Sequence, residues 1–95
     1  PLHEAASVNK PSVIDVLLEA GDHIGAAREV DGWTPLHVAA YSGLPLAVLA
    51  LLKGGAGVNR LDKTGRAPIR LADLGGHASV VTALVEAGAD ESLRY

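Results

Sequence analysis

Four histidines are the side chains of this 95-residue sequence best suited to bind a metal ion or to move a proton near neutral pH. His3 and His37 each directly follow a Pro-Leu pair, so they share one position of a repeated pattern. His23 and His77 fall at two other positions of that pattern, and the His-Glu-x-x-His motif of a zinc-binding helix is absent. We therefore predict no metal site and a structural role for the repeated histidine.

The other side chains that could support catalysis are isolated in the sequence. Ser7 and Ser42 have no neighbouring base to activate them, and Glu4 and Asp73 do not form a pair of carboxylates. The glycine run 54–57 lacks the Gly-Lys-Ser/Thr ending of a phosphate-binding loop, and no calcium-binding loop is present. The sequence therefore predicts a protein that is not an enzyme and needs no cofactor.

Charge and composition exclude several classes of partner. The net charge is −3, and the eight Lys and Arg residues are scattered singly, so we expect no nucleic-acid binding. The longest apolar run, 44–52, contains Pro45 and is too short to cross a bilayer, so we expect no membrane insertion. The absence of cysteine is compatible with a reducing compartment, and we expect a cytoplasmic location, with the nucleus as the alternative. Because the chain begins at Pro1 rather than Met, we expect it to be part of a longer protein.

The elements that carry these residues are predicted by an internal repeat. Hydrophobic residues make up 48% of the chain and aromatic residues only 3%, which favours a core of Ala, Leu and Val between closely spaced helices. Pro1-Leu2, Pro35-Leu36 and Pro68-Ile69 recur after 34 and then 33 residues. Runs of Val and Leu and closing glycines recur in step with these pairs, so the chain consists of three copies of one unit.

Each unit reads as two short helices. Proline is well suited to the first helical position because its φ angle is already helical and its missing N–H is not needed there. Glycine is favoured just after a helix because it adopts the left-handed conformation without steric cost. These signals predict first helices over 35–43 and 68–76, with Thr34 capping the earlier one, and second helices over 11–21 and 45–55.

These residues resemble the ankyrin repeat. The signature T-P-L-H-x-A is complete at Thr34–Ala39, and stretches similar to the family's closing Gly-Ala-Asp stand at Gly55-Ala56 and at Gly88-Ala89-Asp90. The resemblance covers essentially the whole chain. It implies an all-α ankyrin-repeat solenoid of three antiparallel helix pairs joined by β-hairpin-like loops, forming a single domain over residues 1–95.

The resemblance also implies repeat boundaries near 1–28, 29–61 and 62–95, with the first repeat lacking its N-terminal hairpin portion. It implies that the imidazole of His37 bonds to the backbone of the hairpin turns and ties one repeat to the next. In the last copy Ala67 and Arg70 replace Thr34 and His37, so these bonds should be lost there. Asp73 replaces a small apolar residue, and the last copy is therefore interpreted as a polar C-terminal cap.

The function implied by the resemblance is non-enzymatic protein–protein interaction. In this family the hairpin tips and the exposed side of the first helices line a concave face that binds partner proteins. The residues of this sequence placed on that face are Arg28, Val30, Asp31, Trp33, Tyr41, Ser42, Leu61, Lys63, Arg66 and Leu74.

Trp33, the chain's only tryptophan, has two interpretations. It is a contact residue for a partner, since Trp beside Tyr and Arg is typical of a binding hot spot, or it packs on the neighbouring hairpin. Two alternatives to a simple binding module also remain open. The repeats are a regulatory appendage of a larger enzyme, channel or signalling protein, or they self-associate weakly through Val13, Val16 and Leu17 at an uncapped N-terminal end.

Overall fold

A computed structural model of the chain describes residues 31–94. The predicted first helix pair lies outside the described residues, as do Arg28, Val30 and the proposed self-association surface at Val13, Val16 and Leu17. The predicted repeat boundary near residue 28 also lies there. The second and third helix pairs are described in full.

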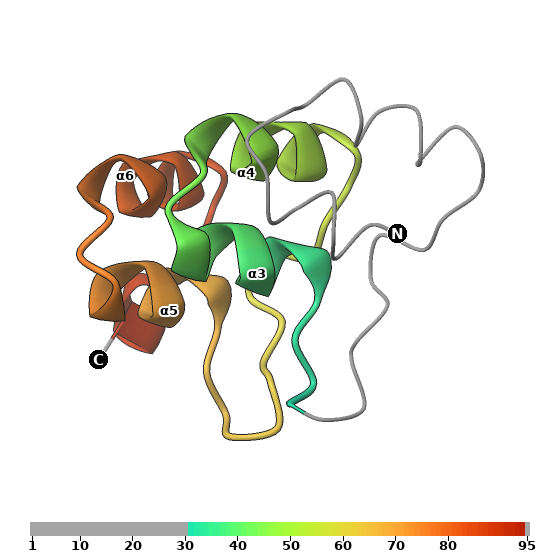
Figure 1. The fold of residues 1–95 in the computed structure, drawn as a ribbon, viewed down its shortest axis with the longest axis vertical. Coiled ribbons are helices and arrows are strands. Elements are labelled where there is room, and N and C mark those ends of the chain that lie inside the picture. The colour runs from blue at the N-terminus through green and yellow to red at the C-terminus, as the bar shows by residue number, and fades with distance from the viewer. Residues whose placement is uncertain (1–30, 95) are drawn as a thin grey trace.

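The described residues form four α-helices and one short 3₁₀ helix. Their bounds are α3 (Pro35–Ser42), α4 (Pro45–Lys53), α5 (Pro68–Leu74), α6 (Ala78–Glu86) and the 3₁₀ helix η1 (Glu91–Arg94). Figure 1 shows α3 and α5 side by side in one layer, and α4 and α6 in a second layer above them. The loop between α4 and α5 projects away from both layers (Figure 1). The arrangement confirms the predicted all-α architecture of stacked helix pairs for the part of the chain described.

The helices α3, α4 and α5 begin at the predicted prolines and end one or two residues before the predicted glycines. Pro35, Pro45 and Pro68 each stand in the first turn of a helix. Gly43 follows α3 in the left-handed conformation with φ 70°, and its backbone N–H bonds back to carbonyls of the last turn. This glycine satisfies helix-end acceptors that a residue with a Cβ atom would reach only with strain.

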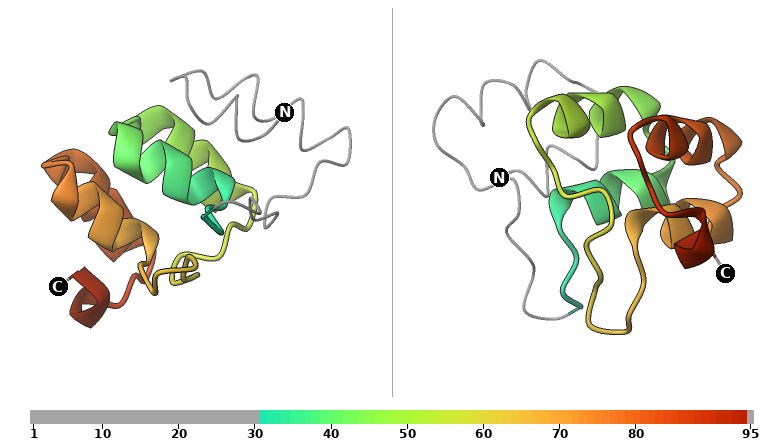
Figure 2. Two further views of the ribbon diagram at one scale, coloured as in Figure 1. Left: turned by 60° about the horizontal axis from the view of Figure 1, so that its bottom comes forward. Right: turned by 180° about the vertical axis from the view of Figure 1, so that it is seen from behind.

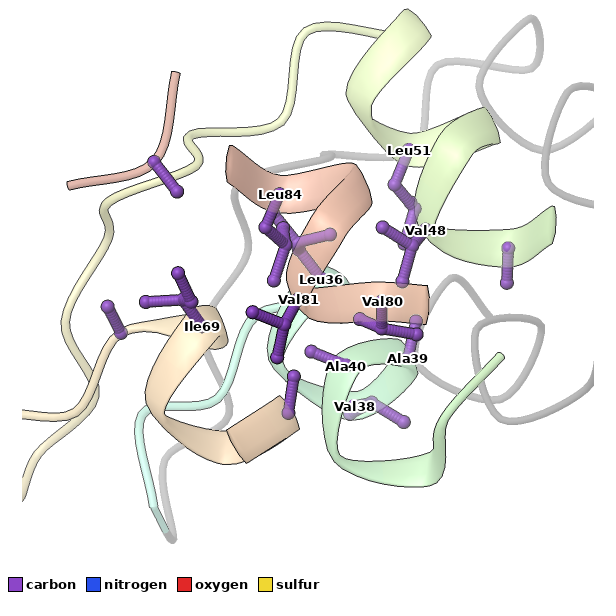
Figure 3. Close-up of a cluster of buried hydrophobic side chains, with 14 of the residues drawn as sticks. Leu36, Val38, Ala39, Ala40, Val48, Leu51, Ile69, Val80, Val81 and Leu84 are labelled. Carbon is purple, nitrogen blue, oxygen red and sulfur yellow. The ribbon is translucent and has the colours of Figure 1, made fainter. Parts of the chain in front are cut away.

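The core lies between the two layers and is built from aliphatic side chains of all four helices. Leu36, Leu51, Ile69 and Leu84 come one from each helix and are fully buried, and they belong to one cluster of buried side chains (Figure 3). Small side chains separate them, which lets the helix axes approach closely. The buried alanines of these helices are Ala39, Ala40, Ala47, Ala50 and Ala72. This confirms the predicted core of Ala, Leu and Val.

Backbone hydrogen bonds hold the predicted hairpin-like loop before α5. The N–H of Lys63 donates to the carbonyl of Asp31 at 2.9 Å, which joins the loop before α5 to the loop before α3. The N–H of Asp62 donates to the carbonyl of Arg66 at 2.8 Å and closes the tip. Within residues 31–94 these bonds do not extend into a strand.

Candidate functional site

His37 connects the first helix of one repeat to the loop of the next. Its side chain is fully buried in the first turn of α3. Nδ1 lies 3.2 Å from the backbone N of Thr34, and the backbone N–H of His37 donates to Oγ1 of Thr34 at 3.4 Å, so the two residues form a reciprocal cap at the start of the helix. Nδ1 also lies 2.8 Å from Oγ1 of Thr34. Nε2 lies 2.9 Å from the carbonyl oxygen of Arg66, 29 residues later. The predicted structural role of His37 is confirmed.

These contacts fix the proton on the imidazole. The carbonyl of Arg66 can only accept, so Nε2 carries the hydrogen and Nδ1 accepts from the N–H of Thr34. Burial lowers the pKa of His37 below its ordinary value of 6.5, although the Arg66 carbonyl and the Asp62 carboxylate act in the opposite direction. His37 is therefore neutral at pH 7, and neither nitrogen is available to a metal ion.

Asp62 organises the loop that receives His37. The Oδ1 atom accepts hydrogen bonds from the N–H of Thr64 (2.9 Å), the hydroxyl of Thr64 (2.8 Å) and the N–H of Arg66 (2.9 Å). The Oδ2 atom accepts from Nε1 of Trp33 at 3.0 Å and lies 3.4 Å from Nε of Arg66. The carboxylate is almost completely buried. It holds both the hairpin tip and the indole of the preceding repeat.

The carboxylate of Asp62 remains ionised to low pH. Burial raises the pKa of Asp62, but hydrogen bonds from the N–H of Arg66, both donors of Thr64 and the indole of Trp33 lower it by more. The resulting pKa is about 2, against an ordinary value of 3.8. A carboxylate with a depressed pKa stabilises the fold above its unfolded-state pKa, and the stabilisation disappears as the pH falls through the folded-state value.

We expect the ionised carboxylate of Asp62 to contribute about 2 kcal/mol to the free energy of unfolding. This contribution is present above pH 4 and is lost as the pH falls toward 2. Urea unfolding at pH values from 7 to 2 measures it. Asp62→Asn should lower stability at pH 7 and flatten the decline below pH 4. Asp90→Asn is the matched control, because exposed Asp90 also accepts from the N–H and hydroxyl of a residue two positions later, Ser92. An acid limb that is unchanged in Asp62→Asn would contradict the assignment.

Trp33 packs within the stack. Its side chain is partly buried against the core, its indole N–H bonds to Asp62, and its ring centroid lies 5.3 Å from that of Tyr41 in a tilted arrangement. Of the two interpretations of this tryptophan, the packed one describes its position. Whether the part that remains accessible also contacts a partner stays a prediction.

The other described residues of the predicted partner-binding face lie along α3 and α5 and in the loops before these two helices. Tyr41 and Leu74 are equivalent residues of adjacent repeats, and each is about half exposed, at 51%. We call the surface formed by Trp33, Tyr41, Ser42, Arg66 and Leu74 the α3–α5 face. Ser42 is exposed on it and Arg66 partly exposed. Leu61 and Lys63 are exposed on the loop, and Asp31 is partly buried, its Oδ1 accepting from the N–H of Trp33 at 2.9 Å.

A second histidine contact joins the repeats at the opposite end of the first helices, and the sequence pattern did not predict it. Nε2 of His77 lies 2.9 Å from the carbonyl oxygen of Tyr41 and donates to it. The ring lies against two glycines, since a Cβ atom built on Gly43 would be 2.4 Å from it and one built on Gly75 would be 2.7 Å from it. His77 has Leu44 as its repeat equivalent, so no recurrence marks it.

The last repeat differs from the pattern at several positions, and two of the substituted residues, Arg70 and Asp73, bond to η1. The predicted loss of the helix cap is confirmed, because Ala67 makes no side-chain hydrogen bond at the start of α5. Asp73 instead accepts from Nε of Arg94 at 2.9 Å, and Arg70 donates to the carbonyl of Arg94 at 3.1 Å. Figure 2 shows η1 on the side of α5 away from α3. The polar substitutions therefore attach a short covering segment to α5.

Residues 31–94 contain no group of three or more His, Asp or Glu side chains placed to hold a metal ion. None of the helices there is long and apolar enough to cross a membrane.

Comparison with known proteins agrees with the repeat pattern. A family model described as ankyrin repeats, in three copies, matches residues 2–94. The chain is 34% identical to Rabankyrin-5 of Mus musculus, over 88% of this chain and 8% of that protein. It is 33% identical to glycerophosphocholine phosphodiesterase GDE1 of Candida albicans, over 88% of this chain and 7% of that protein. It is 35% identical to NF-kappa-B inhibitor alpha of Sus scrofa, over 95% of this chain and 30% of that protein. The chain thus spans less than a tenth of the length of the first two relatives.

Proposed function

Because the chain belongs to the ankyrin-repeat family, whose repeats generally mediate protein–protein interaction, we propose that it binds a partner protein through the α3–α5 face and does no catalysis. The observation that carries the proposal is the pair Tyr41 and Leu74. Both are large apolar side chains at equivalent positions of adjacent helices, and both are half exposed. The repeat pattern needs neither residue for the core.

The rest of the face gives this pair a rigid support. Trp33 contacts the ring of Tyr41 and bonds to Asp62, so both aromatic rings are held in position before a partner arrives. A preorganised surface loses little side-chain entropy on binding, which favours affinity. The guanidinium of Arg66 and the indole of Trp33 both contact Asp62, so the face combines aromatic rings with an arginine, the composition of a binding hot spot.

The test compares equally exposed leucines on different helices. Leu49, on α4, has the same exposed fraction as Leu74, at 51%. For a partner isolated with the parent chain, we expect Tyr41→Ser and Leu74→Ser each to raise Kd by about tenfold or more, as loss of a hot-spot contact does. Leu49→Ser should leave Kd unchanged. Calorimetry with purified partner gives the values, and thermal melts confirm that all three variants remain folded. Weaker binding only in Leu49→Ser would assign the partner to the other layer.

A second candidate is a regulatory or self-associating ankyrin segment of a larger enzyme, channel or signalling protein. The short share that the chain covers of its relatives supports it, since one of them is named as a phosphodiesterase and the chain matches 7% of that protein. Self-association would depend on residues outside those described. Sedimentation of the chain over a range of concentrations, with Val16→Glu as the variant, separates this candidate from binding to another protein.

A further inference from the structure

Arg66, on the α3–α5 face, has a backbone that is fixed on both sides. Its N–H donates to Oδ1 of Asp62 at 2.9 Å. Its carbonyl oxygen accepts from the N–H of Asp62 at 2.8 Å and from Nε2 of His37 at 2.9 Å. Because both backbone groups are bonded, the side chain of Arg66 extends from a fixed point of the loop.

The guanidinium of Arg66 is oriented through one of its three nitrogens. Nε donates to Oγ1 of Thr64 at 2.8 Å and lies 3.4 Å from Oδ2 of Asp62. Within residues 31–94 the side-chain bonds of Arg66 all involve Nε, so Nη1 and Nη2 keep their donors. The side chain is 38% exposed, which leaves it accessible to a partner. An arginine whose Nε is already bonded offers the outer edge of its fork, which matches the two oxygens of a carboxylate.

The charge of the loop that carries Arg66 favours an acidic partner. The loop between α4 and α5, residues 54–67, contains one acidic side chain, Asp62, and it is almost completely buried. Arg60 and Lys63 of the same loop are exposed, and Arg66 is partly exposed. The loop therefore presents positive charge outward, which is complementary to a carboxylate.

The guanidinium adjoins the aromatic part of the α3–α5 face. Nε1 of Trp33 lies 3.0 Å from Oδ2 of Asp62, the same oxygen that Nε of Arg66 approaches. The indole packs against the ring of Tyr41, with ring centroids 5.3 Å apart. Half-exposed Leu74 stands at the position of α5 equivalent to Tyr41. A segment that covers the aromatic rings therefore lies within reach of Arg66.

We propose that the partner of the α3–α5 face carries an Asp or Glu whose carboxylate binds Nη1 and Nη2 of Arg66, while large apolar side chains of the same segment cover Tyr41 and Leu74. This inference rests on the proposed function and adds the chemistry of the partner. A guanidinium already oriented through Nε loses little side-chain entropy on binding. That favours Arg66 over exposed Arg60, which bonds only through its backbone within residues 31–94.

The test uses a phage-displayed library of random peptides, long enough to span the face, selected on the intact chain. We expect the selected peptides to combine an Asp or Glu with large apolar residues. Replacing that acidic residue with Asn or Gln should raise the Kd for the parent chain about tenfold, the effect of losing a charged hydrogen bond. With the Arg66→Gln chain, the same replacement should change Kd by less than about twofold, because the carboxylate has no guanidinium there to lose.

Arg60→Gln is the matched control, because it removes the same charge from the same loop. The Kd of the acidic peptide should stay within about twofold of the parent value in this variant. Arg66→Lys keeps the charge without the fork and should weaken binding nearly as much as Arg66→Gln. Equal losses in Arg60→Gln and Arg66→Gln would show a general attraction by the loop and overturn the inference. The comparison of acidic and amide peptides uses the parent chain, so it does not depend on a variant folding.

Failure of this inference and failure of the proposed function give different results. Selected peptides that lose affinity in Tyr41→Ser and Leu74→Ser but carry no acidic residue would overturn the inference and leave the proposed function standing. Peptides that bind these two variants as tightly as the parent would contradict the proposed function and the inference with it. A selection that enriches no peptide would count against both.

Discussion

His37→Ala is expected to lower the free energy of unfolding by about 3 kcal/mol. The substitution leaves the N–H of Thr34 and the carbonyl of Arg66 without partners in a buried place and creates a cavity where the imidazole was. It removes a helix cap and an inter-repeat contact at once. Urea denaturation of the parent and the variant at pH 7 measures the difference.

Arg70→Ala is the matched control, because Arg70 occupies the equivalent position of the next repeat and makes one bond, to the carbonyl of Arg94. We expect it to cost less than about 1 kcal/mol. Because the folded-state pKa of His37 lies below 6.5, its contribution is present above that pH and declines as the pH falls below it. The parent should therefore lose stability below pH 6.5 more steeply than His37→Ala. A thermal midpoint that drops on addition of EDTA would contradict the structural assignment.

Gly43→Ala is expected to cost a similar amount, about 3 kcal/mol. Part of the cost is backbone strain, because a residue with a Cβ atom at φ 70° loses roughly 1–2 kcal/mol. The remainder comes from His77, whose ring would lie 2.4 Å from the new methyl group. The ring is also closely packed against Gly75, so it can move only by giving up its bond to Tyr41.

Gly76→Ala separates these two contributions. Gly76 is the repeat equivalent of Gly43 and has φ 72°, but a Cβ atom there meets nothing within 4 Å. Gly76→Ala should therefore lower stability only by the backbone strain, roughly 1–2 kcal/mol. Equal losses in the two variants would show that the His77 contact does not stabilise the stack.

Much of the fold was predictable because the repeat appears three times in the sequence. Proline at helix starts and glycine at helix ends have local physical causes, so α3, α4 and α5 begin at the predicted prolines. Thr34 was assigned correctly because it directly precedes the proline that begins a helix, and His37 because the same residue recurs at His3. The helices are recognisable from short-range signals, and their stacking follows from the period.

The contacts that join the repeats were harder to predict. Asp62 stands in a loop, and four of its five contacts are local, to Thr64 and Arg66. The fifth, to Trp33, depends on how the loops of adjacent repeats pack together. A signal was available, since an Asp followed two residues later by Thr favours a local side-chain turn. His77 offered no such signal, because its partner Tyr41 is 36 residues away and its repeat equivalent is a leucine.

Trp33 illustrates the limit of reasoning from a repeat. The pattern specifies no residue type at this position, which left it open to contact with a partner. In the structure the indole instead donates a hydrogen bond to Asp62 in the adjacent loop and packs against the ring of Tyr41. A position that the repeat leaves variable can therefore stabilise one particular stack, and exposed residues such as Leu74 are the more direct probes of binding.

The central claim, that a partner protein binds the α3–α5 face, is tested most directly by photo-crosslinking. Benzoylphenylalanine is placed singly at Tyr41, Leu74 or Leu49, three positions of equal exposed fraction, and each chain is irradiated with the purified partner at a concentration near Kd. The account predicts a covalent product from positions 41 and 74 and none from position 49. A product from position 49 alone would show that the partner binds the α4 side and would contradict the claim.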